Sequence, residues 1–349
     1  LHAQDVLLKA AAAPLPCQNL HGTLLLKNRA LTIKKLACQV GPSTFTLRGT
    51  IPKPISFLLK KSPQLHTHLQ LAVDNLDIDK LMPPPNKEHT DSKSGNTSAP
   101  IGIGIPPPYT LALDYRINDV RYQQFHSQHV RGKLRLNHRK VALEKLQMDL
   151  AGGQVHLDST VNVVPRGLDV STKAKLQRID VVQLLHAFKN FDQTFLTSEH
   201  IRGELTAESD LNVQVAPQGH VRWNTCQAMI DVALRNGALH NHPLMQQTAQ
   251  HMSQQSLTHI QIPTLRKRFR IQDGTIHIPP IDMRAGDVHM RLSGTHTLDD
   301  KINYGLDIPL AGLKGVDEYL PPMLPKNILD DLQLRLKLQG TSRKYKVTY

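Results

Sequence analysis

The chain has 349 residues, with 42 Lys and Arg against 29 Asp and Glu, and a formal net charge of +13. Aromatic residues make up only 4% of it, which argues against a single-strand nucleic-acid binder, because such proteins stack bases on aromatic side chains. Its three cysteines give no disulfide framework. Cys17 and Cys38 flank a predicted hairpin, which leaves open a disulfide or two buried free thiols.

Strict alternation of apolar and polar residues runs through most of the chain and predicts strands with one buried and one wet face. Turn signals as short as Ala151-Gly152-Gly153 separate these segments, which favours antiparallel meanders over βαβ units. The predicted strands include residues 44–51, 65–73, 109–117, 130–136, 154–164, 210–215, 287–294, 303–310 and 332–340.

An internal repeat underlies this pattern. Residues 20–51 align without gaps on residues 130–161, at a shift of 110, and residues 273–295 form a looser third copy. The matches fall mostly at apolar face positions and at turns, so they indicate a shared architecture.

Three short helices interrupt the strands. They are expected at residues 78–82, 181–190 and 243–254. Asp180 is the predicted N-cap of the second helix, and Pro243 suits the first turn of the third. The second helix has an apolar stripe of Val181, Leu184, Leu185 and Phe188, and the third has one that includes Leu244, Met245 and Met252. Such amphipathic stripes predict helices that pack on a sheet.

Residues 83–108 are rich in Pro, Ser, Thr and Asn, and predict a disordered linker because they offer too little apolar surface to bury. The expected organisation is a first β unit over 1–82, this linker, a second β unit over 109–195, and a C-terminal β region over 196–349. The predicted fold class is a long, curled, groove-like antiparallel sheet with a few short helices packed on it.

No sequence motif for catalysis or for a cofactor is present, so a non-enzymatic protein without cofactors is expected. The histidine pairs His66-x-His68 and His240-x-His242 lack companion ligands for zinc, and no metal site is expected. The basic run 266–270 predicts a solvated strand edge, or else a headgroup patch formed by Arg266, Lys267 and Arg268.

The order of motifs from residue 196 to residue 310 resembles the C-terminal region of AsmA-family proteins. These motifs are "RGELTA", "LRNGAL", a helix near Pro243, "FRIQDGTIHI", "GDVHMRLSG" and "INYGLDIPL". "FTLRGTI" with "LDIDKLM", and "LAGGQVHLDSTV" with "IDVVQLL", resemble the part that precedes it. The resemblance covers nearly the whole chain outside the linker, and is greater to the Bacteroidota versions than to the enterobacterial ones.

This resemblance implies a periplasmic protein, held at the inner membrane by an N-terminal anchor outside this sequence, with a role in outer-membrane lipid homeostasis as a bridge-like lipid carrier. Phospholipid or another envelope lipid is the expected partner, and nucleic acid is not. Two alternatives stay open: a structural or assembly β-sandwich without a ligand, and a basic outer face that binds an anionic polymer.

A lipid carrier needs apolar residues along the inner faces of its strands. The residues expected to line that groove all lie on the apolar phase of their strands. They are Leu134, Leu136, Val155, Leu157, Val288, Met290, Leu292, Leu306 and Ile308. Ordinary core packing is the alternative for each of them.

Overall fold

The structure, a computed structural model, describes residues 2–8, 16–54, 65–81, 109–137, 139–192, 196–243, 245–246, 258–309, 332–341 and 344–348. The fold is mostly β, as predicted. All described strands belong to one sheet, and that sheet is not closed. The chain divides into two compact units. The first unit comprises residues 1–150, 154–174 and 214–222, and the second comprises residues 151–153, 175–213 and 223–349.

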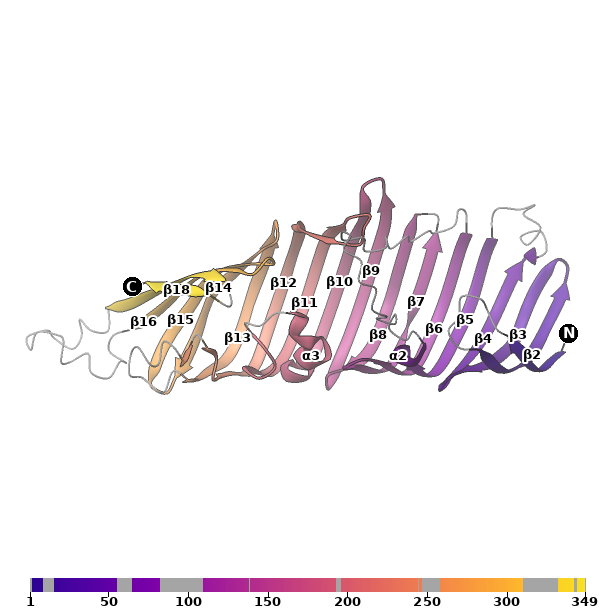
Figure 1. The fold of residues 1–349 in the computed structure, drawn as a ribbon, viewed down its shortest axis with the longest axis horizontal. Coiled ribbons are helices and arrows are strands. Elements are labelled where there is room, and N and C mark those ends of the chain that lie inside the picture. The colour runs from indigo at the N-terminus through magenta and orange to yellow at the C-terminus, as the bar shows by residue number, and fades with distance from the viewer. Residues whose placement is uncertain are drawn as a thin grey trace, which may run out of the picture. The chain divides into compact units, whose positions relative to one another are not determined.

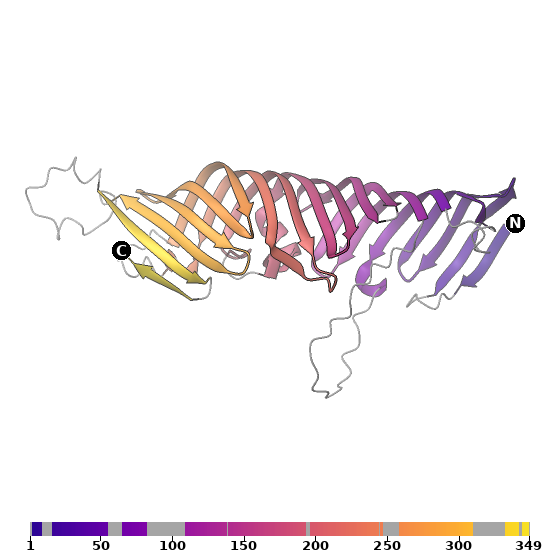
Figure 2. The same ribbon diagram turned by 90° about the horizontal axis from the view of Figure 1, so that it is seen from above.

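Strands β1 to β8 lie in the first unit, where Figures 1 and 2 show β2 to β8 as one layer of neighbouring strands. Each pairs with the next one along the chain. Their bounds are β1 His2–Leu8, β2 Cys17–Lys27, β3 Ala30–Val40, β4 Ser43–Pro52, β5 Leu65–Asp77, β6 Tyr109–Tyr122, β7 Phe125–Asn137 and β8 Lys140–Leu150, with the helix α2 at Ile78–Leu81.

The remaining strands continue in the same way, and each of β12 to β17 pairs antiparallel with its successor in the second unit. The bounds are β9 Gly153–Val164, β10 Gly167–Asp180, β11 Ile201–Val215, β12 Val221–His240, β13 His259–Gln272, β14 Thr275–Ala285, β15 Val288–Thr297, β16 Lys301–Pro309, β17 Gln333–Thr341 and β18 Tyr345–Thr348. Helix α3 covers Val181–Ala187, and a 3₁₀ helix, η1, covers Lys189–Asp192.

One pairing corrects the prediction of a purely antiparallel sheet. Strands β5 and β6 are parallel, with Leu69 opposite Leu113 and Val73 opposite Ile117. Parallel neighbours need a long crossover rather than a tight turn. The 31 residues from Ile78 to Pro108, between the two strands, supply that length. The predicted linker 83–108 lies outside the described residues, and so does the prediction of its disorder.

The 110-residue repeat extends to the strand bounds and to the β-bulges. Strand β3 (30–40) and strand β8 (140–150) differ by 110 at both ends. Asn19 and His129, also 110 apart, both have positive φ, and both lie where the strand register shifts. Since bulges bend a strand and redirect its side chains, the two copies share their local geometry as well as their hydrophobic pattern.

Glycines in two L-x-G-T segments allow neighbouring strands to approach closely. Gly49 has φ +144° and Gly294 has φ +147°, a region that L side chains rarely adopt. A Cβ at Gly49 would collide with the carbonyl oxygen of His68, and one at Gly294 with that of Asn303. The glycine in each segment is therefore required by the backbone.

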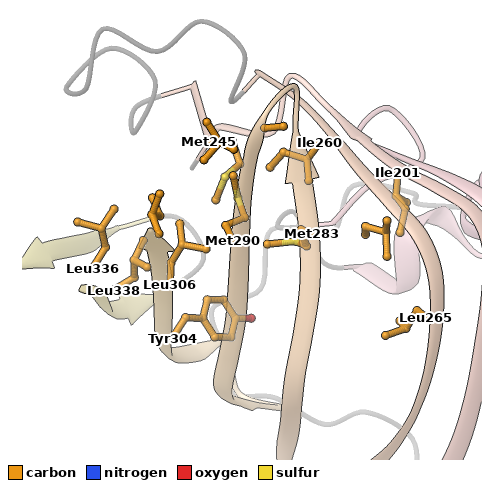
Figure 3. Packing of buried hydrophobic residues seen from close by; sticks show 14 of the residues in the cluster. Ile201, Met245, Ile260, Leu265, Met283, Met290, Tyr304, Leu306, Leu336 and Leu338 are labelled. Carbon is orange, nitrogen blue, oxygen red and sulfur yellow. The ribbon is translucent and has the colours of Figure 1, made fainter. Parts of the chain in front are cut away.

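The main core of the second unit is a cluster of apolar side chains from α3, from Met245 and from strands β11 to β17 (Figure 3). Leu306 and Ile308 on β16 have no exposed surface, and Met245 is 4% exposed. Helix α3 contributes Val181 and Leu185. This cluster confirms that a predicted amphipathic helix packs on the sheet.

The N-terminus of α3 is as predicted, because the Asp180 carboxylate accepts a hydrogen bond from the Gln183 backbone N–H at 2.9 Å. Its C-terminus comes earlier than residue 190. Phe188 is the C-cap and is 39% exposed, where it stacks on Phe191 at 5.2 Å between ring centroids. The positive φ of Lys189, Asn190 and Phe191 ends the helix, so Phe188 leaves the apolar stripe.

The third predicted helix, 243–254, is described only at its start. Pro243, Met245 and Gln246 are helical, and the Gln246 N–H donates to the His242 carbonyl at 2.9 Å. Leu244 and residues 247–257, with Met252 among them, lie outside the described residues. Helix α2 is four residues long, close to the predicted 78–82.

We expect the second unit to lose stability as the pH falls below the ordinary histidine pKa of about 6.5. Burial lowers the pKa of His296 and outweighs the opposing effect of Asp300, and its Nδ1 lies 2.9 Å from the Tyr304 hydroxyl. Since the unfolded chain takes up this proton more readily, the stabilising contribution of His296 is present above the unfolded pKa and is lost below it.

Denaturant unfolding at a series of pH values measures how steeply the free energy of unfolding changes with pH. The variant His296→Gln should show a weaker dependence of stability on pH than the parent. His289 is an exposed residue of the same strand, so His289→Gln should keep the dependence of the parent. Equal pH dependence in the parent and in both variants would contradict this expectation.

Candidate functional site

The register of β3 to β8 brings apolar side chains to one face of the sheet in four rows that run across the strands. Residues directly opposite each other in paired strands lie on the same face, so each row follows from the pairing alone. The four rows, which together form the apolar face, are Cys38, Phe45, Val73, Ile117 and Val130; Leu36, Leu47, Leu71, Tyr115 and Gly132; Gly49, Leu69, Leu113, Leu134 and Leu143; and Leu111, Leu136 and Val141.

Most of the apolar face is only half-buried. Val73 and Val130, in the first row, are 3% and 8% exposed, whereas the other members of the rows are of intermediate exposure. Helix α2 contacts these strands through β6. A contiguous apolar area that stays partly in contact with water is unusual for a protein surface and is typical of a binding surface.

A local detail shows how closely the second row is packed. A Cβ at Gly132 would lie 2.5 Å from the Tyr115 hydroxyl oxygen and 2.9 Å from its Cζ, so the ring of Tyr115 covers the position where Gly132 lacks a side chain. Burial raises the pKa of the Tyr115 hydroxyl. The Tyr115 ring and its hydroxyl group therefore fill the row at the glycine, where the hydroxyl adds one polar atom.

The predicted lining residues fall into two groups. Leu134 and Leu136 belong to the apolar face, and on β9 Leu157 is half-buried and Val155 is 5% exposed. Those of the second unit lie inside its core, where Val288, Met290, Leu306 and Ile308 are at most 3% exposed and Leu292 packs against them. Among the predicted lining residues, those that keep partly exposed side chains and can meet a ligand are thus mainly in the first unit.

The basic run 266–270 lies on β13, which is between β12 and β14 in the sheet. The whole run pairs with β12, whereas on the β14 side only Arg270 has an assigned partner, His277. Arg268 donates two hydrogen bonds to the Asp231 carboxylate, at 2.7 and 2.9 Å, and this contact lowers the pKa of Asp231. Arg266 and Arg268 share a face, whereas Lys267 points to the other one together with Leu265 and Phe269. The three predicted headgroup contacts therefore do not converge.

Of the two histidine pairs, the side chain of His66 lies outside the described part of the structure, and the other three histidines have neighbours other than a metal-ligating cluster. His68 Nε2 lies 3.1 Å from the Asp114 carboxylate. His240 packs edge-to-face on His259, and His242 on His200, each at 5.4 Å between centroids. No group of three or more metal-ligating side chains occurs among the described residues. Within the same part of the chain, no helix combines the length and the hydropathy needed to cross a membrane.

Cys17 and Cys38 are both free thiols of intermediate exposure. Burial, followed by the hydrogen bond and charge of the neighbouring Cys17, raises the pKa of Cys38 to about 11. Cys38 therefore stays protonated and slow to react at neutral pH. Its place in the first row makes it a reporter for the apolar face.

A second feature of the first unit lies on the opposite face of the same strands. The sequence interpretation left open a basic outer face but did not locate it or name its residues. On that face a hollow of about 730 Å³ is lined by cations of β3, β4 and β6 to β8. Lys35 and Lys145 among them are 110 residues apart, so the repeat, inspected for charge as well as for hydrophobicity, carried a signal for this hollow.

No protein-family model, no curated protein and no solved structure matches the chain.

Proposed function

We propose that the apolar face of the first unit binds the acyl chains of a phospholipid or similar envelope lipid, and that the protein transfers such lipids without catalysing a reaction. The observation that carries this proposal is the set of four apolar rows, each of which crosses three to five strands and most of whose members are only half-buried. In this proposal the face is the floor of a groove along which acyl chains lie.

The dimensions of the rows suit an acyl chain. The longest rows cross five neighbouring strands, and four steps of about 4.8 Å between them give about 19 Å. One leaflet of a bilayer has a hydrocarbon thickness of about 15 Å, half of the full core. A row is therefore long enough to cover a whole chain, and burial contributes about 0.8 kcal/mol for each CH₂ removed from water.

The resemblance to AsmA-family proteins supports the same proposal and extends it to the periplasm, with attachment to the inner membrane and a contribution to outer-membrane biogenesis. The packed core of the second unit favours a second candidate for that part of the chain, a structural role without a ligand. The buried side chains of this core, at 0–8% exposure, leave an acyl chain almost no surface unless the core opens.

The test uses Cys38 as a probe. The protein is mixed with phospholipid vesicles and re-isolated, its lipid content is measured by native mass spectrometry, and the three cysteines are alkylated at about pH 9. We expect bound lipid and slower alkylation of Cys38, because acyl chains cover the first row. Cys226, 1% exposed in a separate cluster of the second unit, should be unaffected.

Two results would count against lipid binding at this face. One is protein that carries no lipid after purification and takes up none from vesicles. The other is bound lipid with unchanged Cys38 alkylation, which would move the site away from the apolar face.

A further inference from the structure

The hollow on the other face of the first unit, here called the basic hollow, is lined by six cations and one carboxylate. The cations are Lys35, Arg48, Arg116, Arg131, Lys133 and Lys145, and the carboxylate is Asp114. Its volume of about 730 Å³ falls in the range of small-molecule sites.

Two β-bulges contribute to this accumulation of charge. Between Ile33 and Leu36 on β3, two lysines lie opposite the single residue Arg48 on β4. At the repeat-equivalent place on β8, Lys145 has φ +53° beside a register shift against β7. Bulges redirect side chains at the point where the extra residue enters, and Lys35 and Lys145 both line the basic hollow.

The cations of the basic hollow are poorly neutralised within the protein. Arg116 and Arg131 lie directly opposite each other on β6 and β7, and like charges in that position are destabilising. Arg131 donates through Nε to the Gln147 amide oxygen at 2.7 Å. Asp114 is 3.1 Å from His68 and 3.7 Å from Lys133, so the one carboxylate is already shared.

The polar face of the second unit shows the alternative arrangement. There arginines and aspartates alternate across the strands, as in the Arg291–Asp282 pair at 2.7 Å and the Arg335–Asp307 pair at 2.6 Å. Opposite charges in such cross-strand pairs stabilise a sheet. The excess of cations in the basic hollow is thus a local departure from a pattern that the same chain uses elsewhere.

A second hollow of about 570 Å³ adjoins the first and shares Arg116, Arg131 and Gln147 with it. His156 lines this second hollow, and its Nδ1 is buried without a hydrogen-bond partner among the described residues. Buried polar atoms in folded proteins nearly always have a partner. A ligand bound near this ring nitrogen and the two opposed arginines would therefore supply the hydrogen-bond partner and the negative charge that the protein does not provide.

We propose that the basic hollow binds a soluble oligoanion that carries two or more phosphate groups. Guanidinium groups bind phosphate oxygens through paired hydrogen bonds, and the hollow contains three. Lipid held on the apolar face lies on the other side of the sheet, so its headgroup is not the ligand. A concave site also fits a compact anion better than it fits a flat bilayer. The proposal is independent of lipid binding.

The experiment is calorimetric titration of the whole protein with inorganic tripolyphosphate at two salt concentrations, and a parallel assay with phosphatidylglycerol vesicles. The variant Arg116→Gln/Arg131→Gln is compared with Lys27→Gln/Lys140→Gln. The second variant loses the same charge at exposed residues that line neither hollow. We expect tripolyphosphate to bind, more weakly at high salt, and the arginine variant to bind it at least about tenfold more weakly, with the lysine variant close to the parent.

A readout of stability separates binding from a structural role. Without ligand, the arginine variant should melt at the same temperature as the parent or higher, because the opposed charges are gone. Equal loss of affinity in both variants would overturn the proposal in favour of general charge attraction. Absence of tripolyphosphate binding would overturn it too, as would vesicle binding that requires Arg116 and Arg131 while tripolyphosphate does not compete.

Discussion

Met245→Asp is expected to lower the free energy of unfolding by about 3–5 kcal/mol. Met245 is 4% exposed and belongs to the core of the second unit, in the same cluster as Met290 (Figure 3). An aspartate there would place an unpaired charge among apolar side chains, either ionised without a partner or forced to stay protonated. Chemical denaturation followed by circular dichroism measures the change.

The neighbouring residue provides a matched control. Gln246 is exposed and lies on the same helical turn, so Gln246→Asp introduces the same charge into water and should change stability by less than about 0.5 kcal/mol. If both variants unfold at the denaturant concentration of the parent, the segment that begins at Pro243 contributes nothing to the core, and its packing on the sheet is wrong.

Leu113→Asp is expected to weaken lipid binding at least about tenfold while the β content persists. Leu113 lies in the third row of the apolar face, between Leu69 and Leu134, and is half-buried. A carboxylate at that position denies apolar contact to several CH₂ groups of a bound chain. At about 0.8 kcal/mol each, the loss of two of them amounts to about one order of magnitude in affinity.

Ala112→Asp is the control for this experiment, because Ala112 precedes Leu113 and faces the other side of the sheet. Its neighbours across the strands are His68 and Arg135, beside which a carboxylate is favourable. Binding of fluorescent phospholipid and far-UV circular dichroism are measured for both variants. Identical binding in both would exclude the apolar face as the site, whereas the proposal requires only Leu113→Asp to lose lipid.

Most of the strands were predictable from the sequence, because they alternate with period two and are separated by short turns. The N-terminus of α3 was predictable from Asp180, since a carboxylate at an N-cap has a defined partner two or three residues on. The C-terminus of α3 was not. The apolar periodicity continues to Phe188, and only the backbone, with positive φ at Lys189, shows that the helix has ended.

The sequence pattern also could not predict that β6 runs parallel to β5. Alternation fixes which residues share a face but carries no information on whether neighbours run parallel, and the crossover between them is a polar segment without periodicity. For the site, Leu134 and Leu136 were placed on the apolar face by their phase alone. The same phase could not distinguish them from Leu306 and Ile308, because enclosure in a core depends on what covers a strand and not on the strand itself.

The position of the basic hollow could not be predicted from the sequence, because it depends on how the strands pair. A single lysine such as Lys145 reads as an ordinary solvated residue, and its bulge becomes evident only when the register against β7 is known. Arg116 and Arg131 are 15 residues apart, and nothing in their spacing shows that they lie opposite each other.

The parallel pairing of β5 with β6 has a consequence for the order of folding. Strands β2 to β5 form by successive antiparallel pairings between neighbours in the chain, and the β2–β3–β4 turns close small loops at little entropic cost. The β5–β6 pairing must first close a segment of 31 residues from Ile78 to Pro108. Since pairings of high sequence separation form late, the sheet of the first unit should assemble as two preformed meanders, β2–β5 and β6–β8, that join at β5–β6 last.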